Sequence, residues 1–343
     1  MLSPQILSVL PEKAVPGGEV IITCSDFDTS SFSRCAVYFG SVSGRIIGAS
    51  QERVIASVPF VPAAKGQSGI QLAVGDKKSN VHPFVVAERL AENLHPVSNP
   101  AIDYDTGSIY VTLSGQMGQK VPVSVWKISA DGMLNPFLGD LVNPTAIAFD
   151  SEGIMYISSR HDGCVYKISP LKDVEPYARN LGVATGIAFD SEDNLYVGDR
   201  QGTIFVIDRS SKKVSKFASL EPSVSAYHLA FDRDGNLYVA GPTTSSFDSI
   251  VRIDQNGKVS KFFTGFGRPQ GLAFDEDGNL YVVASYRGRR GVYRLTPYGE
   301  ATIVVAGNSL VGLAFDNRGN MILASTREVF RLKCDIRGIL GSL

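Results

Sequence analysis

Residues 271–282 read GLAFDEDGNLYV, an apolar run that ends in Phe-Asp, a short polar turn, and a second apolar run with a tyrosine. The same phrase occurs six times along the chain, with isoleucine in place of the tyrosine in the sixth copy. Its first runs, each closed by Phe-Asp or Tyr-Asp, are Ala101–Asp105, Ala146–Asp150, Gly186–Asp190, His228–Asp232, Gly271–Asp275 and Gly312–Asp316. The closing aspartates lie between 40 (190 − 150) and 45 (150 − 105) residues apart. A fixed period of about forty residues is typical of stacked or radial repeats, so this phrase decides the fold.

Each repeat reads as four strands. In the fifth copy these are residues 271–274, 280–284, 292–295 and 301–305, and the turn at 275–279 consists of residues that accept tight backbone angles. No segment shows helical periodicity. Four-stranded sheets cannot bury both faces alone, whereas a radial arrangement packs each sheet on its neighbours. The pattern therefore predicts an all-β chain whose residues 101–343 form a six-bladed β-propeller.

The wording of the repeats adds a family resemblance. GLAFD at 271–275 followed by GNLYV at 278–282 resembles the NHL and SMP-30/gluconolactonase-like propellers, and the likeness covers about residues 98–340. It implies the fold but no single activity, because that superfamily contains lactonases, lyases, synthases and pure binding proteins. The WD40 signature is missing, since Trp126 is the only tryptophan.

Residues 1–88 lie outside the repeat and read as short strands separated by turn residues. The predicted strands are residues 20–23, 36–39, 45–47, 54–58, 70–74 and 84–86. Strands of alternating polarity over this length predict a small β-sandwich. Residues 89–100 then form a linker to the propeller.

This first segment also resembles a known family. PGGEVII at 16–22, VYFG at 37–40, Val58-Pro59 and Ser79-Asn80 resemble an IPT/TIG domain. Such immunoglobulin-like modules usually act as spacers or interaction domains, so the resemblance implies a spacer or a docking site for a protein partner.

The overall composition limits the class of partner. The chain has 33 Lys and Arg against 34 Asp and Glu, and without clustered cations we expect no general nucleic-acid binding. No apolar run reaches the roughly 20 residues of a membrane helix, so we expect no membrane span. The start, MLSPQILSVLPEKAVPGG, does not read as a signal peptide. We expect a cytoplasmic protein, or else one whose leader has been removed.

The four cysteines are Cys24, Cys35, Cys164 and Cys334. They show neither CxxC nor metal-ligand spacing, which indicates free thiols. A disulfide between Cys24 and Cys35 is the alternative.

Strand direction separates two ends of the predicted propeller. In an antiparallel meander of four strands, the first-to-second and third-to-fourth turns share one end, which we call the turn face. The other connections share the opposite end, which we call the mouth. The turns are near copies and need no function, whereas the mouth loops differ in length and chemistry. Variable loops on a rigid scaffold are the usual place for binding groups.

Arginine outnumbers aspartate at the mouth. The arginines are Arg160, Arg200, Arg268, Arg287, Arg289 and Arg290, and the aspartates are Asp162, Asp199 and Asp248. A guanidinium holds a carboxylate or phosphate with two parallel hydrogen bonds, so we expect a small anionic ligand. The alternative is that the arginines pair with the aspartates or face solvent.

Three of the four histidines map near the mouth: His95, His161 and His228. Imidazole suits proton transfer near neutral pH and is also a common metal ligand. We predict no cofactor, with a divalent metal bound by histidine as the alternative.

The SMP-30 resemblance implies calcium, which those lactonases bind with Asn and Asp just before the glycine of the first strand. The matching residues here are Pro100, Thr145, Thr185, Tyr227, Gln270 and Val311. None is a carboxylate or an asparagine, so the sequence predicts no calcium site of that kind.

Two functions follow. The first is a hydrolase or lyase acting on a small anionic metabolite, with His161, His228 and Asp199 in proton transfer. Arg160 and Arg200 then bind the anion. Further ligand contacts are expected from Asn99, Asn143, Thr185, Tyr227, Gln270, Tyr286 and Arg287. The second function is a non-catalytic binding or protein-interaction propeller.

One expectation concerns how the propeller ring closes. The last repeat needs a fourth strand, and the segment 336–340 is the remaining candidate. We therefore expect the propeller to close without a strand from the N-terminal region.

Overall fold

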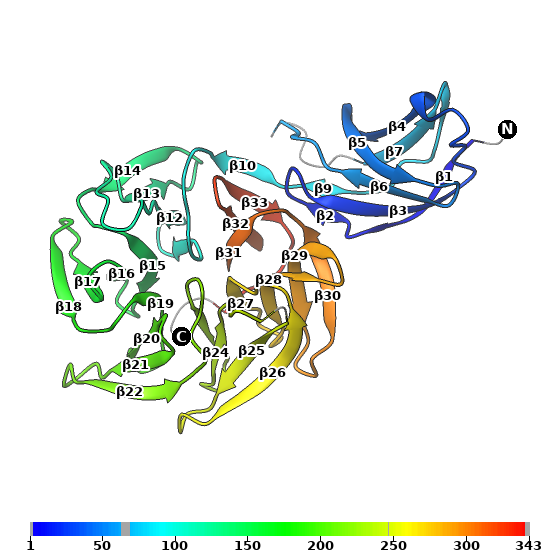
Figure 1. The fold of residues 1–343 in the computed structure, drawn as a ribbon. Helices are drawn as coiled ribbons and strands as arrows, with labels where there is room; N and C mark the ends of the chain where they lie inside the picture. Colours follow the sequence, from blue (N-terminus) through cyan, green and yellow to red (C-terminus); the bar gives the residue numbers. More distant parts are fainter. Residues whose placement is uncertain (1–2, 63–68, 246, 340–343) are drawn as a thin grey trace.

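The structure is a computed structural model that describes residues 3–62, 69–245 and 247–339. Strands dominate the described chain, which has a single short 3-10 helix at Phe32–Arg34. Figure 1 shows an N-terminal domain beside a larger ring of sheets that surrounds a central axis. Among the described residues, no helix has the length and hydropathy that a membrane span needs.

The N-terminal domain is one curled sheet of seven strands in the order β1-β3-β6-β5-β4-β7-β8. The strands are β1 (Gln5–Leu10), β3 (Glu19–Ser25), β4 (Cys35–Phe39), β5 (Val42–Ala49), β6 (Arg53–Ser57), β7 (Ile70–Val74) and β8 (Lys77–Lys78). Alternation fixes the inner face: Val20, Ile22 and Cys24 of β3 are buried, and they join Phe39 and Leu72 in one core. Of the five predicted strands between residues 20 and 74, four fall within observed strands, and the fifth, 54–58, runs one residue past the end of β6.

The propeller follows as successive antiparallel sheets (Figure 1). Four of them take four consecutive strands each: β11 (Ala101–Asp103), β12 (Ser108–Thr112), β13 (Val125–Ile128) and β14 (Leu134–Leu138); β15 (Pro144–Phe149), β16 (Met155–Ser159), β17 (Cys164–Ile168) and β18 (Val174–Ala178); β19 (Ala184–Phe189), β20 (Leu195–Asp199), β21 (Thr203–Ile207) and β22 (Val214–Ser219); β23 (His228–Phe231), β24 (Leu237–Ala240), β25 (Asp248–Ile253) and β26 (Val259–Phe266).

The last two sheets include strands from near the N-terminus. One begins with β27 (Leu272–Phe274), β28 (Leu280–Tyr286), β29 (Arg289–Leu295) and β30 (Ala301–Ala306), and continues into β2 (Lys13–Ala14) and β9 (Val85–Val86). The other contains β31 (Leu310–Phe315), β32 (Asn320–Ser325) and β33 (Val329–Lys333), with β10 (Glu88–Ala91) beside β33. The predicted strand at 84–86 therefore joins the propeller through β9, because β9 pairs with β2, which pairs with β30.

The repeated phrase has a packing explanation. In the first five repeats the tyrosine of the second strand meets the phenylalanine of the next sheet's first strand edge to face, a geometry that aromatic pairs prefer. The ring centroids lie 4.9 to 5.7 Å apart in Tyr110–Phe149, Tyr156–Phe189, Tyr196–Phe231, Tyr238–Phe274 and Tyr281–Phe315. The same contact therefore recurs at five interfaces between adjacent sheets.

The aspartate of the phrase has a separate role in the turn. In five copies its carboxylate accepts hydrogen bonds from the backbone N–H groups two and four residues later, at Asp150, Asp190, Asp232, Asp275 and Asp316. Asx turns of this kind satisfy backbone donors that the sheet does not pair. The conserved chemistry of the turn face is thus structural.

The expectation about ring closure is wrong. The fourth strand of the last sheet is β10, whose Glu88 and Arg89 pair with Arg331 and Phe330 of β33. The expected linker 89–100 thus begins as a propeller strand. Residues 336–339 form only an isolated bridge between Gly338 and Asp275, and Leu340 lies outside the described residues.

Candidate functional site

The register of the sheets fixes which residues lie at the mouth. Pro144 pairs with Ser159 and Ala184 with Asp199, so first strands begin where second strands end. His228 pairs with Ala240 in the same way. The predicted site residues therefore share one end of the propeller, but their side chains separate into several groups.

The first group surrounds residues 115–118, in the loop between β12 and β13. Asn143 is 1% exposed, and its amide accepts from Gly118 N at 2.6 Å and donates to the carbonyls of Gly115 and Gln116, both at 2.9 Å. Arg160 Nη2 donates to Gly115 O at 3.2 Å. A Cβ on Gly118 would lie 3.5 Å from His161 Cε1, so the imidazole lies against the same loop. Three predicted residues thus converge here.

Arg160 and Arg200 form a cationic pair at this place. Burial and the nearby Arg200 guanidinium both lower the pKa of Arg160. Both effects therefore disfavour the positive charge of Arg160. Arg160 Nε is buried without a hydrogen-bond partner in the described chain. None of the seven ion pairs among the described residues involves Arg160 or Arg200. The alternative that these two arginines pair with aspartates therefore finds no ion pair among the described residues.

A cavity of about 530 Å³ lies beside Arg160. Its other lining residues are Asn93, His95, Leu113, Ser114, Gly115, Gln116, Gln119 and Val121. His95 Nδ1 lies 3.1 Å from Ser114 O, which places this histidine at the loop rather than at the axis with His228. The sequence did not single out the polar residues of the loop. Loop length could have indicated them, because the 112–123 connection is the longest loop between a second and a third strand in the repeats.

A second group is used by the scaffold. Asp199 is 4% exposed, and its Oδ1 accepts from Val183 N at 2.8 Å and from Gln201 N at 3.1 Å. Thr185 Oγ1 donates to Gly198 O at 2.8 Å and accepts from Tyr227 N at 3.2 Å. The Tyr227 hydroxyl donates to Glu221 O. The bond from Tyr227 N links β19–β22 to the segment that enters the next sheet, and backbone partners already occupy the Thr185 hydroxyl and one Asp199 oxygen.

His228 is buried in the scaffold. It is 1% exposed, and neither ring nitrogen has a partner among the described protein atoms. Burial lowers the pKa of His228 from 6.5 to about 4, so the ring is neutral near pH 7. His161, in contrast, is exposed. The two histidines therefore do not form a shared acid–base pair on one surface.

The remaining predicted residues lie elsewhere at the mouth. Asn99 bridges two sheets, because its Nδ2 donates to Leu272 O at 3.0 Å and its Oδ1 accepts from Leu313 N at 3.2 Å. Gln270 donates its backbone N–H to Val283 O at 2.8 Å. Tyr286 and Arg287 belong to the β28–β29 hairpin, three sheets around the ring from Arg160.

The donor set does not fit the calcium that the SMP-30 resemblance implies. Thr185, one of the matching positions, already uses its hydroxyl within the scaffold. Among the described residues, no three His, Cys, Asp or Glu side chains gather closely enough to hold a metal ion. The four cysteines are free, so Cys24 and Cys35 are not bridged.

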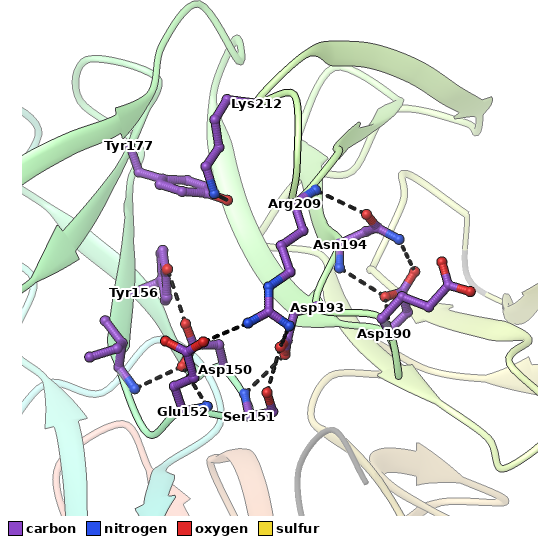
Figure 2. A network of polar contacts seen from close by, with 12 residues as sticks. Asp150, Ser151, Glu152, Tyr156, Tyr177, Asp190, Asp193, Asn194, Arg209 and Lys212 are labelled. Atoms are coloured by element: carbon purple, nitrogen blue, oxygen red, sulfur yellow. Dashed lines mark hydrogen bonds and ion pairs between the residues drawn. The ribbon is translucent and has the colours of Figure 1, made fainter.

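The turn face has a smaller cleft of about 280 Å³ between β15–β18 and β19–β22. Figure 2 shows Arg209 between Glu152 and Asp193, at 2.6 and 2.7 Å. Asp193 is 4% exposed and also accepts from Ser151 N at 2.9 Å in the neighbouring turn (Figure 2). Asp193 has a φ of +58° and stands at the turn position where three later repeats have glycine. These satisfied contacts form a brace between two sheets.

Comparison with known proteins supports the fold. A model of the β-propeller repeat family matches residues 218–248. No curated protein sequence matches the chain. Among solved structures, a candidate gluconolactonase is 19% identical over 74% of this chain and 93% of its own, with a TM-score of 0.62. The calcium-binding protein regucalcin from Agrobacterium tumefaciens is 16% identical over 74% and 95%, with a TM-score of 0.59.

Some of the similar structures extend over both domains. An auxiliary nutrient binding protein from Bacteroides thetaiotaomicron is 13% identical over 97% of this chain and 98% of its own, with a TM-score of 0.57. At these identities the likeness shows the fold alone. The chain is therefore an all-β protein with a propeller of the kind found in gluconolactonase-like and regucalcin-like structures.

Proposed function

We propose that the mouth binds a small anionic molecule at Arg160 and Arg200. The observation that carries this proposal is the absence of a carboxylate partner for either arginine in the described chain, although burial and mutual repulsion both disfavour the charge of Arg160. A carboxylate or phosphate between the two guanidinium groups removes that repulsion and supplies acceptors for unpaired N–H groups.

The adjoining cavity gives the rest of the ligand a place. Asn143 fixes the 115–118 loop with three hydrogen bonds, so one wall of the cavity is held in position. The lining combines apolar Leu113 and Val121 with polar Gln116 and Gln119. Such a mixture of apolar walls and a few polar groups is usual for small-molecule sites.

A hydrolase or lyase is the second candidate. One observation favours it: His161 is exposed and lies beside Gly118. Its imidazole directly follows Arg160, the residue that we propose binds the anion. In this proposal His161 is the acid–base group. We assign His228 and Asp199 to the scaffold, because one is buried without access and the other accepts backbone hydrogen bonds.

We also propose a finer description of the architecture. Counting β27–β30 as one blade and β31–β33 with β10 as another gives six blades around the axis. The N-terminal domain is then an IPT/TIG-like module that holds its place by pairing β2 with β30. These assignments rest on the strand order and on the sequence resemblance.

Calorimetric titration with citrate and with inorganic phosphate tests the anion site, with glycerol as the neutral comparison. We expect saturable binding of at least one anion, weakened about tenfold or more by Arg160→Gln or Arg200→Gln, since each tenfold corresponds to about 1.4 kcal/mol. Arg318→Gln, an exposed arginine of the turn face, is the matched control. Equal binding by wild type and both mouth variants would refute the site.

The enzyme candidate needs a separate readout. A panel of carboxylated lactones and esters is incubated with wild type and with His161→Gln. Turnover that disappears in His161→Gln while anion binding persists supports acid–base catalysis. Binding without turnover leaves the binding protein as the function.

A further inference from the structure

The β28–β29 hairpin carries an arginine where its turn favours asparagine. Tyr286 pairs with Arg289, so Arg287 and Gly288 form a two-residue turn. Both have positive φ, +49° and +77°. Turns of this type prefer Asn-Gly or Asp-Gly, because other side chains pay to enter the left-handed region. The arginine is thus not explained by the turn itself.

Three further arginines lie at the same place. Arg289 and Arg290 continue the hairpin, and the bridge between Gly267 and Ser285 brings Arg268 alongside. We call Arg268, Arg287, Arg289 and Arg290 the arginine cluster. None of the four takes part in an ion pair of the described chain.

The carboxylate that does contact the cluster is committed to the backbone. Asp248 is 3% exposed, and its Oδ1 accepts from the backbone N–H and the hydroxyl of Thr243. Its Oδ2 accepts from Arg268 N at 3.3 Å. Asp248 therefore makes no ion pair with these arginines, of which Arg268, Arg287 and Arg290 are exposed.

Aromatic side chains support and flank the cluster. The Arg287 guanidinium carbon lies 5.0 Å from the Tyr286 ring centre, a cation–π contact that orients the group. Tyr286 in turn packs on Phe266 and Phe263. Phe247, which precedes Asp248, is 69% exposed. Phe247 is joined to the cluster through its neighbour Asp248, which accepts from Arg268 N. Exposed aromatic residues and arginines are the residue types enriched in protein-binding hot spots.

We propose that the arginine cluster and Phe247 dock a short acidic segment of a partner protein. The charge of the cluster is local, because the whole chain has a net charge of −1. A short acidic segment with one apolar side chain complements the four arginines and the exposed Phe247, whereas the chain as a whole has no cationic excess to hold a long polyanion. This surface is independent of the anion site at Arg160.

The probe is a fluorescein-labelled peptide of about twelve residues that carries aspartate and glutamate around one phenylalanine. Its control replaces the acids by asparagine and glutamine. Anisotropy at low salt should show binding of the acidic peptide alone, and binding should weaken as salt screens the charges. The double variant Arg287→Asn, Arg290→Gln should weaken binding about tenfold or more, with each tenfold near 1.4 kcal/mol.

Two controls distinguish a loss of peptide binding from a loss of folding. Arg287→Asn places a preferred residue in the turn, so the variant should melt at or above the wild-type temperature. Arg318→Gln should bind the peptide as wild type does. The proposal is overturned if neither peptide binds, if the amide peptide binds equally, if the double variant is unchanged, or if a single-stranded DNA oligonucleotide binds in preference.

Discussion

His228 offers the sharpest test of the structure, through replacement by leucine. The wild-type ring is buried with both nitrogens unpartnered, and its pKa falls from 6.5 to about 4 on folding. The unfolded chain therefore binds a proton at His228 more readily than the folded chain does. The unfolding free energy keeps the full contribution of the neutral ring above about pH 6.5 and loses it as the pH is lowered toward 4. Below that pH both states are protonated and the loss is constant.

The shift gives the magnitude. A difference of 6.5 against about 4 at roughly 1.4 kcal/mol per unit corresponds to about 3 kcal/mol of unfolding free energy lost at low pH. At pH 5 the same relation gives about 2 kcal/mol. Leucine fills a similar volume without titrating, so His228→Leu should lack this part of the pH dependence.

Urea unfolding at about pH 8, 6 and 5 measures the effect in wild type, in His228→Leu and in His161→Leu. The difference between wild type and His228→Leu should grow by about 2 kcal/mol from the highest to the lowest pH. His161→Leu, which removes an exposed histidine, controls for the loss of one imidazole. Parallel pH profiles for wild type and His228→Leu would show that the ring is reached by solvent or finds a partner.

Three further outcomes are expected. Asp193→Gly relieves a left-handed backbone but removes the bonds to the neighbouring turn, and should lower the unfolding free energy by about 1 to 2 kcal/mol in urea titration. Deleting residues 1–87 should leave a cooperatively folding propeller, whereas deleting residues 1–91 also removes β10 and should abolish cooperative thermal unfolding. Asn143→Ala should raise the hydrogen exchange of Gly118 N–H, because the amide that accepts from it is lost.

Much of the fold could be predicted because the repeated phrase is explained by contacts between adjacent sheets. Its tyrosine and phenylalanine meet across five interfaces between adjacent sheets, and its aspartate closes the turn that follows. Both needs recur with the period of the chain, so they leave a visible pattern. The strands of the fifth repeat were accordingly predicted to within a few residues.

Ring closure could not be predicted in this way. The residues of β10, Glu88–Ala91, carry no signal that distinguishes them from a linker, since an edge strand needs only backbone groups and one or two apolar contacts. The partner strand β33 lies at the other end of the chain. A local sequence pattern does not indicate that two strands so far apart in the chain pair with each other.

The candidate site was predicted only as a region. Sequence position places Asp199, Thr185 and Asn143 at the mouth, but it does not reveal that their polar atoms are occupied by backbone groups from other strands. Arg160 and Arg200 stay predicted binding residues, because neither has a carboxylate partner in an ion pair of the described residues. Whether the polar atoms of a buried residue are already hydrogen-bonded is a property of the three-dimensional structure, which the sequence pattern does not show.

The pairing of β10 with β33 has a consequence for synthesis on the ribosome. Arg89 and Glu328, which meet across this pair, are 239 residues apart. At about 5 to 20 residues per second, β10 waits on the order of 12 to 50 seconds for its partner to be translated. During that time the nascent ring is open, with two unpaired edges that could capture strands from other chains. The N-terminal domain emerges first and carries β10 directly behind it, so the closing strand is already tethered to a folded body when β33 leaves the exit tunnel.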